Sequence, residues 1–379
     1  MALTAPKKEK RTNSALQDSS MTANAPDVDE IRAAQLAVEY YGIEANAKCL
    51  VSEKDANFRL DPVRSTNAST NGQIELEKPE PASTQRYTLK VVNAEEPKGR
   101  STFATDALAH ISVREPNLPI PQIISNLAGD NQTTVRIDGT EHVIRMLTYL
   151  DGAPLSTVPV ERMPLSDIGA CLGQLDRALS DFEHPHMHFS MLWDSANVDG
   201  LSDLLKHVPP TEDCLSLETA LKQFSDETKP KLSRLRHQII HNDANLSNLL
   251  VDQDKPDQLT GIFDFGDMIF APTINELGVV ASYHVREDAS PAQTIGALAA
   301  GYHQAFPLTA EEVSLLPALA IARQMTTILI THWRAELFPD NAPYILRNNR
   351  VAWRGFTVLM REDQNALISD LREACGMEL

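Results

Sequence analysis

The order of apolar and polar positions predicts strands in the first part of the chain. Two short apolar segments between residues 47 and 60 lie on either side of a polar turn at residues 52–56, which indicates a pair of strands. Residues 87–92 alternate, so one face of a third strand carries apolar side chains and the other carries Lys90. Further strands are expected at residues 122–127, 133–137 and 142–147, with an Asp138–Gly139 turn between the last two.

A helix is expected before these strands. Apolar residues recur at helical spacing over residues 29–41, which places Ile31, Ala34 and Val38 on one face. Gly42 follows as the C-terminal stop, since glycine is the residue that most readily ends a helix.

From Pro164 onward the apolar spacing becomes helical. Apolar side chains recur at steps of three and four residues, at Leu165, Ile168, Leu172, Leu175, Leu179 and Phe182. Further helical segments are expected at residues 200–207, 212–236, 291–306, 309–337, 342–361 and 363–375. The second part of the chain is therefore expected to be mainly helical.

One stretch interrupts this helical pattern and carries the most chemistry. The tripeptide His-Asn-Asp at residues 241–243 follows two isoleucines, and Asn248 lies five residues after the aspartate. An apolar run at residues 249–251, a polar turn and a second apolar run that ends in Asp264 come next. The pattern predicts two strands joined by a turn, with polar groups where the strands end.

Phosphoryl transfer requires this set of side chains. One carboxylate accepts the proton of the attacking hydroxyl, while an amide and a second carboxylate hold Mg²⁺ on the phosphates of the donor, here GTP or ATP. We expect Asp243 to be the catalytic base, and Asn248 and Asp264 to hold the metal ion. A His-x-Asp motif alone is usually a chance match or a turn cap, but the ordered combination favours a kinase-like site.

The motifs HNDANLSNLLV at residues 241–251 and GIFDFGDM at residues 261–268 resemble the aminoglycoside phosphotransferase family, and within it most the hydroxylysine kinase branch. The resemblance extends from about residue 28 and implies an α+β, two-lobed protein-kinase-like fold. It implies a small mixed α/β lobe and a mainly helical lobe. Because the His-Arg-Asp and Ala-Pro-Glu motifs of protein kinases are missing, the acceptor is expected to be a small molecule rather than a protein. The resemblance implies an amino-bearing alcohol as this acceptor, with 5-hydroxylysine as the first candidate.

The same resemblance implies a nucleotide site in the first part of the chain. The turn Ser-Glu-Lys-Asp-Ala-Asn-Phe is similar to a pattern of the hydroxylysine kinase branch, so Ser52 and Asn57 are expected to meet the phosphates. Lys90 is the candidate for the α- and β-phosphates, and the backbone from Thr148 to Leu150 for the purine edge. A plain hairpin turn and a plain linker are the alternatives for these two segments.

Kinases normally hold this lysine with a glutamate from the following helix. Here that helix is expected at residues 101–112, and the glutamate position falls on Ala104. Either Asp106 or Glu96 is then expected to replace the glutamate, or Lys90 is held in another way. The missing glutamate also leaves open a catalytically silent nucleotide-binding module.

Residues near the motifs are candidates for substrate binding and support. Trp193 and Asp194 match a feature of the same branch, and an aromatic ring beside a carboxylate can hold an ammonium group by cation–π and charge contacts. Structural packing of Trp193 is the alternative. Asp267 is a further substrate candidate. His241 and Glu276 are expected to support the catalytic loop, with Glu276 at the position where the family usually has an aspartate.

Two arginines are candidates for binding a substrate carboxylate. Arg323 and Arg334 lie in the predicted helix at residues 309–337, where surface arginines are ordinarily solvated. Arg323 and Gln324 also interrupt the most apolar segment, residues 315–331, so no segment is expected to span a membrane.

Composition narrows the possible partners. The chain has 379 residues and a formal net charge of −18, which argues against nucleic acid and suits a cationic acceptor. Its four cysteines have no CxxC spacing, which is typical of thiols in a reducing compartment, and we expect a cytoplasmic protein. The partners are therefore expected to be a nucleotide and a small amino alcohol, with no nucleic acid and no membrane.

The predicted organisation has three parts. Residues 1–27 are expected to be a disordered tail, residues 28–150 the nucleotide-binding lobe with a flexible insert at 61–86, and residues 151–379 the helical lobe. The catalytic loop at 241–248 and the metal site at 264–267 lie in the last part. Other acceptors of this class of kinase (homoserine, choline, ethanolamine or an aminoglycoside) remain open at this point.

Overall fold

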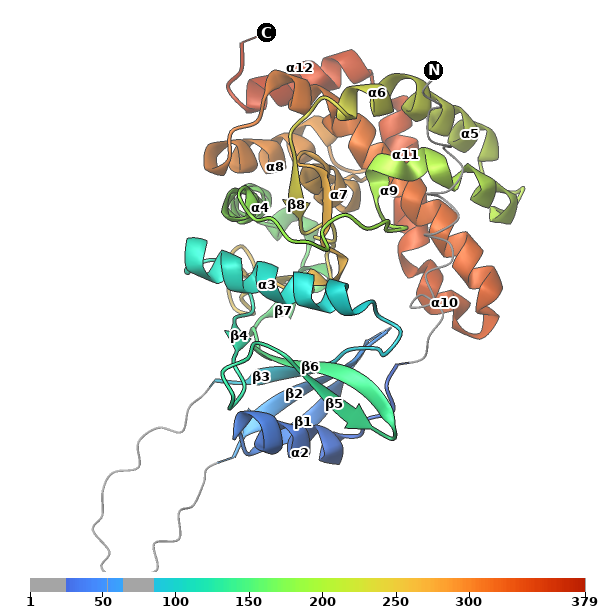
Figure 1. Ribbon diagram of the computed structural model, residues 1–379. Helices are drawn as coiled ribbons and strands as arrows, with labels where there is room; N and C mark the ends of the chain where they lie inside the picture. The colour runs from blue at the N-terminus through green and yellow to red at the C-terminus, as the bar shows by residue number, and fades with distance from the viewer. Residues whose placement is uncertain (1–24, 53, 64–84, 379) are drawn as a thin grey trace, which may run out of the picture. The chain divides into compact units, whose positions relative to one another are not determined.

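A computed structural model describes residues 25–52, 54–63 and 85–378 (Figure 1). Most of the expected tail at 1–27 and of the expected insert at 61–86 lies outside these described residues. The chain divides into two compact units. The smaller contains the described residues up to Ala109 together with Pro119–Asp151, and the larger contains His110–Leu118 and the chain from Gly152 onward.

The smaller unit is built on an antiparallel sheet. Its strands follow the order β1-β2-β3-β6-β4, and β5 also pairs with β6. The strands are β1 (Ala45–Leu50), β2 (Ala56–Pro62), β3 (Tyr87–Val91), β4 (Ile123–Ile124), β5 (Thr133–Ile137) and β6 (Thr140–Thr148). Helix α2 (Glu30–Tyr41) covers one face of this sheet, and helix α3 (Lys98–Arg114) lies along the other (Figure 1).

The face of α2 that meets the sheet differs from the predicted one. Ile31 and Val38 are 71% and 46% exposed, whereas the buried side chains are Ala33, Leu36, Ala37 and Tyr41. Both faces carry apolar residues at helical spacing, so periodicity alone does not choose between them. The chosen face carries two alanines, and these small side chains let the helix lie close to the core residues of the sheet.

The predicted strands of the smaller unit form, and one of them is much shorter than expected. Asp138 and Gly139 have φ of 47° and 85°, as a two-residue hairpin turn requires, and β5 and β6 flank them. The strand expected at residues 122–127 is reduced to β4, because the side chain of Asn126 accepts hydrogen bonds from the N–H groups of Ala128 and Asp130 and turns the chain.

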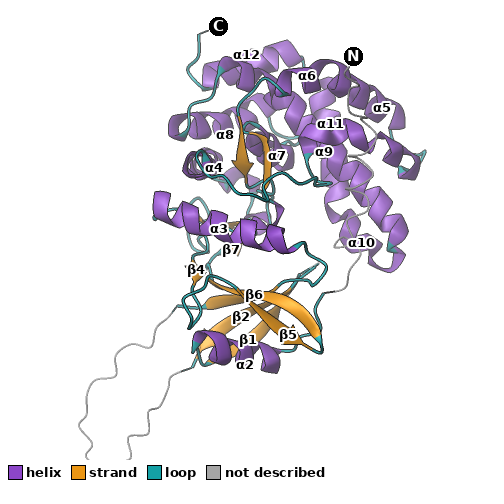
Figure 2. Ribbon diagram, viewed as in Figure 1, coloured by secondary structure: helices purple, strands orange, loops and turns teal. Residues whose placement is uncertain are grey.

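The larger unit is mainly helical with short strands among the helices (Figure 2). Its helices are α4 (Leu165–Leu179), α5 (Cys214–Gln223), α6 (Lys229–Leu232), α7 (Asn275–His284), α8 (Pro291–Ala305), α9 (Ala310–Leu337), α10 (Ala342–Ile345), α11 (Asn349–Arg361) and α12 (Gln364–Ala374). Its strands are β7 (Ala153–Pro154), β8 (His237–Ile240), β9 (Leu249–Val251), β10 (Leu259–Ile262) and β11 (Ile269–Pro272). The last strand, β11, has no counterpart among the predicted elements.

Several predicted helices are divided or tighter than expected. The segment at 212–236 consists of α5, a π-turn at Phe224–Thr228 and α6, and the segment at 342–361 consists of α10, a 3₁₀ turn at Leu346–Asn348 and α11. The helix expected at 200–207 is a 3₁₀ segment that begins earlier, at Ser195. Apolar spacing of three and four residues is common to these helix types, so it does not distinguish them.

Helices α4 and α8 pack at a distance that only glycine permits. A Cβ atom on Gly169 would lie 2.0 Å from the carbonyl oxygen of Leu298, and one on Gly301 would lie 2.0 Å from that of Ser166. Both approaches are far below van der Waals contact, so the two backbones meet directly at these residues.

Helix α9 is long and apolar enough to cross a membrane by length and composition alone. However, 89% of its most apolar window is buried inside the protein, and Arg323 and Gln324 lie within that buried part. A lipid-facing helix would present its apolar residues outward, so α9 is a core helix of the larger unit.

Candidate active site

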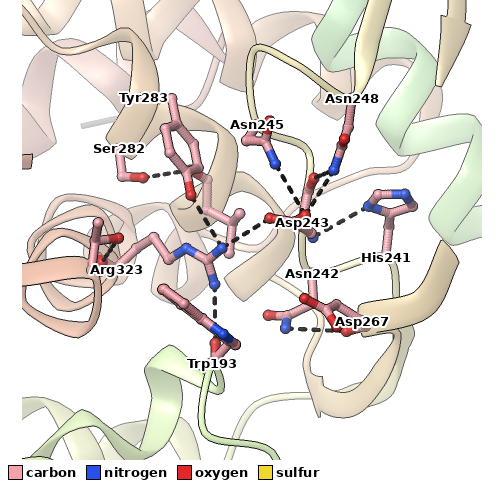
Figure 3. A network of polar contacts seen from close by, with 12 residues as sticks. Trp193, His241, Asn242, Asp243, Asn245, Asn248, Asp267, Ser282, Tyr283 and Arg323 are labelled. Atoms are coloured by element: carbon pink, nitrogen blue, oxygen red, sulfur yellow. Dashed lines mark hydrogen bonds and ion pairs between the residues drawn. The ribbon is translucent and has the colours of Figure 1, made fainter. Parts of the chain in front are cut away.

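Two strand pairs bring the loops of the catalytic stretch together. Strand β8 pairs with β11, and β9 pairs with β10, both antiparallel. The loop at residues 241–248 leads from β8 to β9, and the loop at residues 263–268 leads from β10 to β11. Polar side chains of both loops, of α7 and of α9 form one network (Figure 3).

His241 joins the two loops. It is fully buried, its Nε2 bonds to the carbonyl oxygen of Phe263 at 3.2 Å, and its Nδ1 accepts the N–H of Asp243 at 3.2 Å. Burial lowers the pKa of His241, against the opposing charge of Asp264. A neutral ring that donates through Nε2 and accepts through Nδ1 satisfies both bonds, so His241 is a structural link between the loops.

The backbone of both loops contains a residue in the left-handed region. Asn242 has φ of 65° and Asp264 has φ of 66°, a conformation that costs free energy for residues other than glycine. Asn242 is held there by its side chain, which donates to the carbonyl oxygen of Asp267 at 3.2 Å. Such a backbone conformation persists only where surrounding contacts enforce it, and it is often found in functional loops.

Glu276, at the start of α7, holds the backbone of the loop at residues 241–248. Its Oε2 accepts the N–H groups of His241 at 2.6 Å and of Asn242 at 3.2 Å. Glu276 is fully buried, and burial raises its pKa to about 7, although these two hydrogen bonds act in the opposite direction. Its carboxyl group therefore supports the loop backbone rather than facing a substrate.

Asp243 is held by three side chains. Oδ2 accepts hydrogen bonds from Asn245 at 3.0 Å and from Asn248 at 2.7 Å, and Oδ1 accepts one from Arg323 at 3.1 Å (Figure 3). A carboxylate has about four acceptor positions, so one remains on Oδ1 for the hydroxyl of a substrate. The Asp243 side chain keeps 18% of its surface exposed, which allows a substrate to reach it.

The electrostatics of Asp243 suit a proton acceptor. The pKa of Asp243 is raised to about 7, and burial is the largest cause. The charge of Arg323 acts to lower this pKa, and the charges of Asp267 and Asp264 act to raise it. A base whose pKa lies close to neutral pH combines a useful ionised fraction with a useful affinity for the proton.

Arg323 lies in this network, and neither of the two roles expected from the sequence, a ligand of a substrate carboxylate or a solvated surface residue, describes it. It is only 2% exposed, and besides Asp243 it donates to the carbonyl oxygen of Trp193 at 3.0 Å and to the hydroxyl of Tyr283 at 3.2 Å. Its guanidinium also lies over the Trp193 ring, 5.2 Å from the centroid. A charged side chain inside the most apolar helix is expected to be buried and therefore paired, and its position in that helix is the sequence signal that indicates a buried role for Arg323.

Asn248 and Asp264 present oxygen atoms suited to a divalent cation. The Nδ2 of Asn248 donates to Asp243, so its Oδ1 is left as the acceptor, and its backbone carbonyl accepts the N–H of Phe263 at 3.1 Å, one residue before Asp264. Asp264 is exposed, and its carboxylate forms no hydrogen bond or ion pair with any other described residue. An amide oxygen and a carboxylate are ligand types that fit Mg²⁺, which prefers oxygen ligands and takes the rest from phosphates and water.

Trp193 and Asp194 have partners other than the expected ammonium group. The two oxygens of Asp194 accept hydrogen bonds from the N–H of Ala196 at 3.0 Å and the side chain of Asn197 at 2.5 Å, so Asp194 caps the 3₁₀ segment that begins at Ser195. The Trp193 ring packs against Arg323, which agrees with the alternative of structural packing, and the ammonium site on this pair stays a prediction.

In the smaller unit, Lys90 pairs with an acid that sequence analysis did not consider. Its Nζ lies 2.7 Å from Oδ2 of Asp55, in the turn between β1 and β2. Glu96 pairs with Arg100 instead, and within the described ranges neither Glu96 nor Asp106 bonds to Lys90. Of the alternatives that the missing helix glutamate left open, neither Asp106 nor Glu96 replaces it, and Lys90 is held in another way, by Asp55.

The other expected nucleotide residues lie in the same unit. Asn57 is the neighbour of Lys90 across β2 and β3, and its Oδ1 is buried without a hydrogen-bond partner in the described structure. Ser52 lies in the turn beside Asp55. The N–H of Thr148 donates to Gln122 at 2.9 Å and is not available to a purine, whereas that of Leu150 forms no bond within the part of the chain described here.

The fold and this network define a class of protein. A sequence model of the phosphotransferase enzyme family matches residues 73–311, and the chain belongs to this family. The α+β architecture of two units is that of the kinase-like fold, and the chain is a small-molecule phosphotransferase that acts on a hydroxyl group.

Particular relatives are similar over nearly their whole length. The chain is 27% identical to hydroxylysine kinase of Mus musculus over 363 residues, which cover 92% of this chain and 93% of that one. A solved structure of a microcompartment-associated aminopropanol kinase has a TM-score of 0.58, with 18% identity and coverage of 91% and 95% of the two chains. Amicoumacin kinase hAmiN, solved with AMP-PNP, Ca²⁺ and Ami, has a TM-score of 0.62, with 13% identity and coverage of 90% and 97%.

Proposed function

We propose that this protein transfers the γ-phosphoryl group of ATP or GTP to the hydroxyl of an amino-bearing small molecule, with 5-hydroxylysine as the first acceptor. The observation that carries the proposal is the carboxylate of Asp243, held by Asn245, Asn248 and Arg323 with one acceptor position left. The similarity to hydroxylysine kinase over most of both chains supports the choice of acceptor.

The residues of the larger unit would act as follows. Asp243 accepts the proton of the acceptor hydroxyl as its oxygen attacks phosphorus. Arg323 and the two asparagines fix the carboxylate and favour its ionised form. Asn248 and Asp264 would hold Mg²⁺, which when bound offsets the negative charge of the phosphates. His241 and Glu276 keep the loop in place.

The residues of the smaller unit would bind the nucleotide. Lys90 offers its ammonium group to the α- and β-phosphates, and Ser52 and Asn57 offer polar groups next to it. The free N–H of Leu150 is the group we assign to the purine edge in place of Thr148. Neither ATP nor GTP is favoured by these groups, and both belong in the test.

The amino group of the acceptor fits the charge of the site. Asp267 lies near enough to Asp243 to raise the pKa of that carboxyl group, so the loop at residues 263–268 adds negative charge beside the base. We propose that Asp267 attracts the ammonium group of the acceptor. The net charge of −18 favours a cationic molecule and disfavours nucleic acid.

Composition and burial support a proposal for the cellular setting. All four cysteines are free, and the helix that is apolar enough for a membrane lies in the core. We therefore propose a cytoplasmic enzyme whose partners are a nucleotide and a small amino alcohol, with no membrane and no nucleic acid.

A panel of acceptors tests the proposal. Purified protein with Mg²⁺ and either ATP or GTP is offered 5-hydroxylysine, homoserine, choline, ethanolamine and an aminoglycoside, and phosphorylated product is measured. We expect the highest kcat/KM with 5-hydroxylysine. Faster transfer to another acceptor would show that 5-hydroxylysine is not the preferred acceptor. Tight nucleotide binding without transfer to any acceptor would favour a silent nucleotide-binding module.

A further inference from the structure

Both members of the ion pair between Lys90 and Asp55 are largely buried in the smaller unit. The side chains are 14% and 13% exposed, so both charges are largely removed from water. Asp55 also accepts the N–H of Asn93 at 2.9 Å, and the side chain of Asn93 donates to the carbonyl oxygen of Lys54 at 2.9 Å. These bonds tie the turn after β1 to the end of β3.

Lys90 favours the ionised form of Asp55. Burial alone would raise the pKa of Asp55, yet its pKa is lowered by the charge of Lys90, by the hydrogen bond from Lys90 and by the bond from Asn93. The attraction therefore exceeds the cost of burying the carboxylate. An ammonium group has three donors, so one bond to Asp55 leaves two for phosphate oxygens.

Helix α3 is attached to the sheet by a different residue. Arg145 is the neighbour of Lys90 on β6, and its Nη1 donates to the carbonyl oxygen of Ser101 at 3.2 Å and the hydroxyl of Thr105 at 3.0 Å. Ala104, where a glutamate was expected, is buried and has no polar group. The helix is thus held without any bond to Lys90.

We propose that Asp55 is the positioning residue of Lys90, so that the acid comes from the turn between β1 and β2 and not from helix α3. The inference rests on the proposed function, because it concerns how Lys90 is presented to the nucleotide. It goes beyond that function in two ways. Formation of the pair does not depend on α3, and a nucleotide that contacts the turn acts on both members of the pair.

Substitution of Asp55 tests the inference, and a second ion pair of similar burial provides the control. Glu96 and Arg100 form a second, equally buried ion pair in the same unit, with 12% and 9% exposure, so Glu96→Gln is the control. We expect Asp55→Asn to lower kcat/KM for the nucleotide by about 10- to 100-fold, the usual cost of removing a group that orients a binding side chain. The KM of the acceptor stays the same, Asp55→Glu restores part of the loss, and Glu96→Gln changes kcat/KM by less than about threefold.

A double-mutant cycle shows whether Asp55 acts through Lys90. Once Lys90 is replaced by Met, the change Asp55→Asn is expected to cause no further loss, because the group that it positions is gone. Losses that multiply would overturn the inference, as would an Asp55→Asn variant equal to the wild type or a Glu96→Gln variant that loses as much. The melting temperature of each variant shows whether it is folded.

The same variants separate this inference from the proposed function. Titration with Mg²⁺–ATP and Mg²⁺–GTP measures the Kd without any need for an acceptor. If wild-type protein transfers no phosphate but Asp55→Asn weakens nucleotide binding and Glu96→Gln does not, the role of Asp55 stands and the proposed reaction fails. If transfer occurs and Asp55→Asn leaves the Kd and kcat/KM unchanged, the proposed reaction stands and the role of Asp55 fails.

Discussion

At the scale of single residues, the site depends on the balance between burial and one positive charge. Asp243 lies where desolvation favours the protonated form, and Arg323 opposes that effect from the middle of α9. Arg323 has no exposed surface of consequence, so it is not free to bind a substrate carboxylate, as considered from the sequence. Its contacts instead favour the ionised form of the Asp243 carboxylate and hold that carboxylate in one orientation.

Replacing Arg323 by Met is expected to damage both stability and catalysis. Breaking a buried ion pair by removing one partner costs about 3–5 kcal/mol in the free energy of unfolding, because the other charge stays buried. The pKa of Asp243 would rise further, so kcat at neutral pH falls as well. Urea unfolding and initial rates measure the two effects, and Arg334→Met on the same helix is the control because Arg334 does not contact Asp243.

Glu276 gives the protein a pH-dependent term in stability. Its pKa is raised by burial from 4.5 to about 7, so the folded state keeps a proton that the unfolded state has lost. This contribution is complete below about pH 4.5 and is lost as pH rises to about 7, a change of about 3 kcal/mol. Glu276→Gln keeps an acceptor for the two N–H groups and removes the titration.

Comparison of the wild type with the Glu276→Gln variant isolates the effect of Glu276, since all other groups titrate in both proteins. We expect similar free energies of unfolding at pH 5 and a Glu276→Gln variant that is the more stable at pH 8. A difference that is the same at both pH values would contradict the assigned ionisation of Glu276.

At the scale of elements, the sequence predicts what local pattern determines. The strands around residues 52–56, strand β3 with Lys90 opposite its core face, and helix α4 all follow from period two or period three to four. The face of α2 does not, because Ile31 and Val38 compete with Leu36 and Tyr41 and only the sheet decides between them. Strand β11 was missed because it exists through pairing with β8, a contact that distant residues make.

The direct contact of α4 with α8 provides a prediction at this scale. Gly301→Ala places a methyl group against the carbonyl oxygen of Ser166, and we expect a loss of about 1–3 kcal/mol or more in the free energy of unfolding. Gly296→Ala on the same helix meets only side-chain atoms among the described residues, the Cβ of Ala374 at 3.2 Å and a Cδ of Leu371 at 3.8 Å, and gains helix propensity. Thermal unfolding of both variants checks the prediction, and equal stability would contradict it.

At the scale of the whole molecule, the sequence predicted the fold class and the catalytic stretch, but not what holds the site. The α+β kinase-like fold and membership of the phosphotransferase enzyme family are confirmed. The order of His241, Asp243, Asn248 and Asp264 was visible because all lie within one stretch. Arg323 comes from a helix 80 residues after Asp243, and Asp55 lies 35 residues before Lys90, so only the folded chain reveals these pairs.

The most direct test of the central claim is the turnover of Asp243→Asn. With saturating nucleotide and the best acceptor, we predict a kcat lower by about 10²- to 10⁴-fold, or roughly 3–5 kcal/mol in the barrier, because the asparagine does not accept the proton of the hydroxyl. The Kd for Mg²⁺–nucleotide is predicted to stay near the wild-type value. A kcat close to that of the wild type in a folded variant would contradict the account.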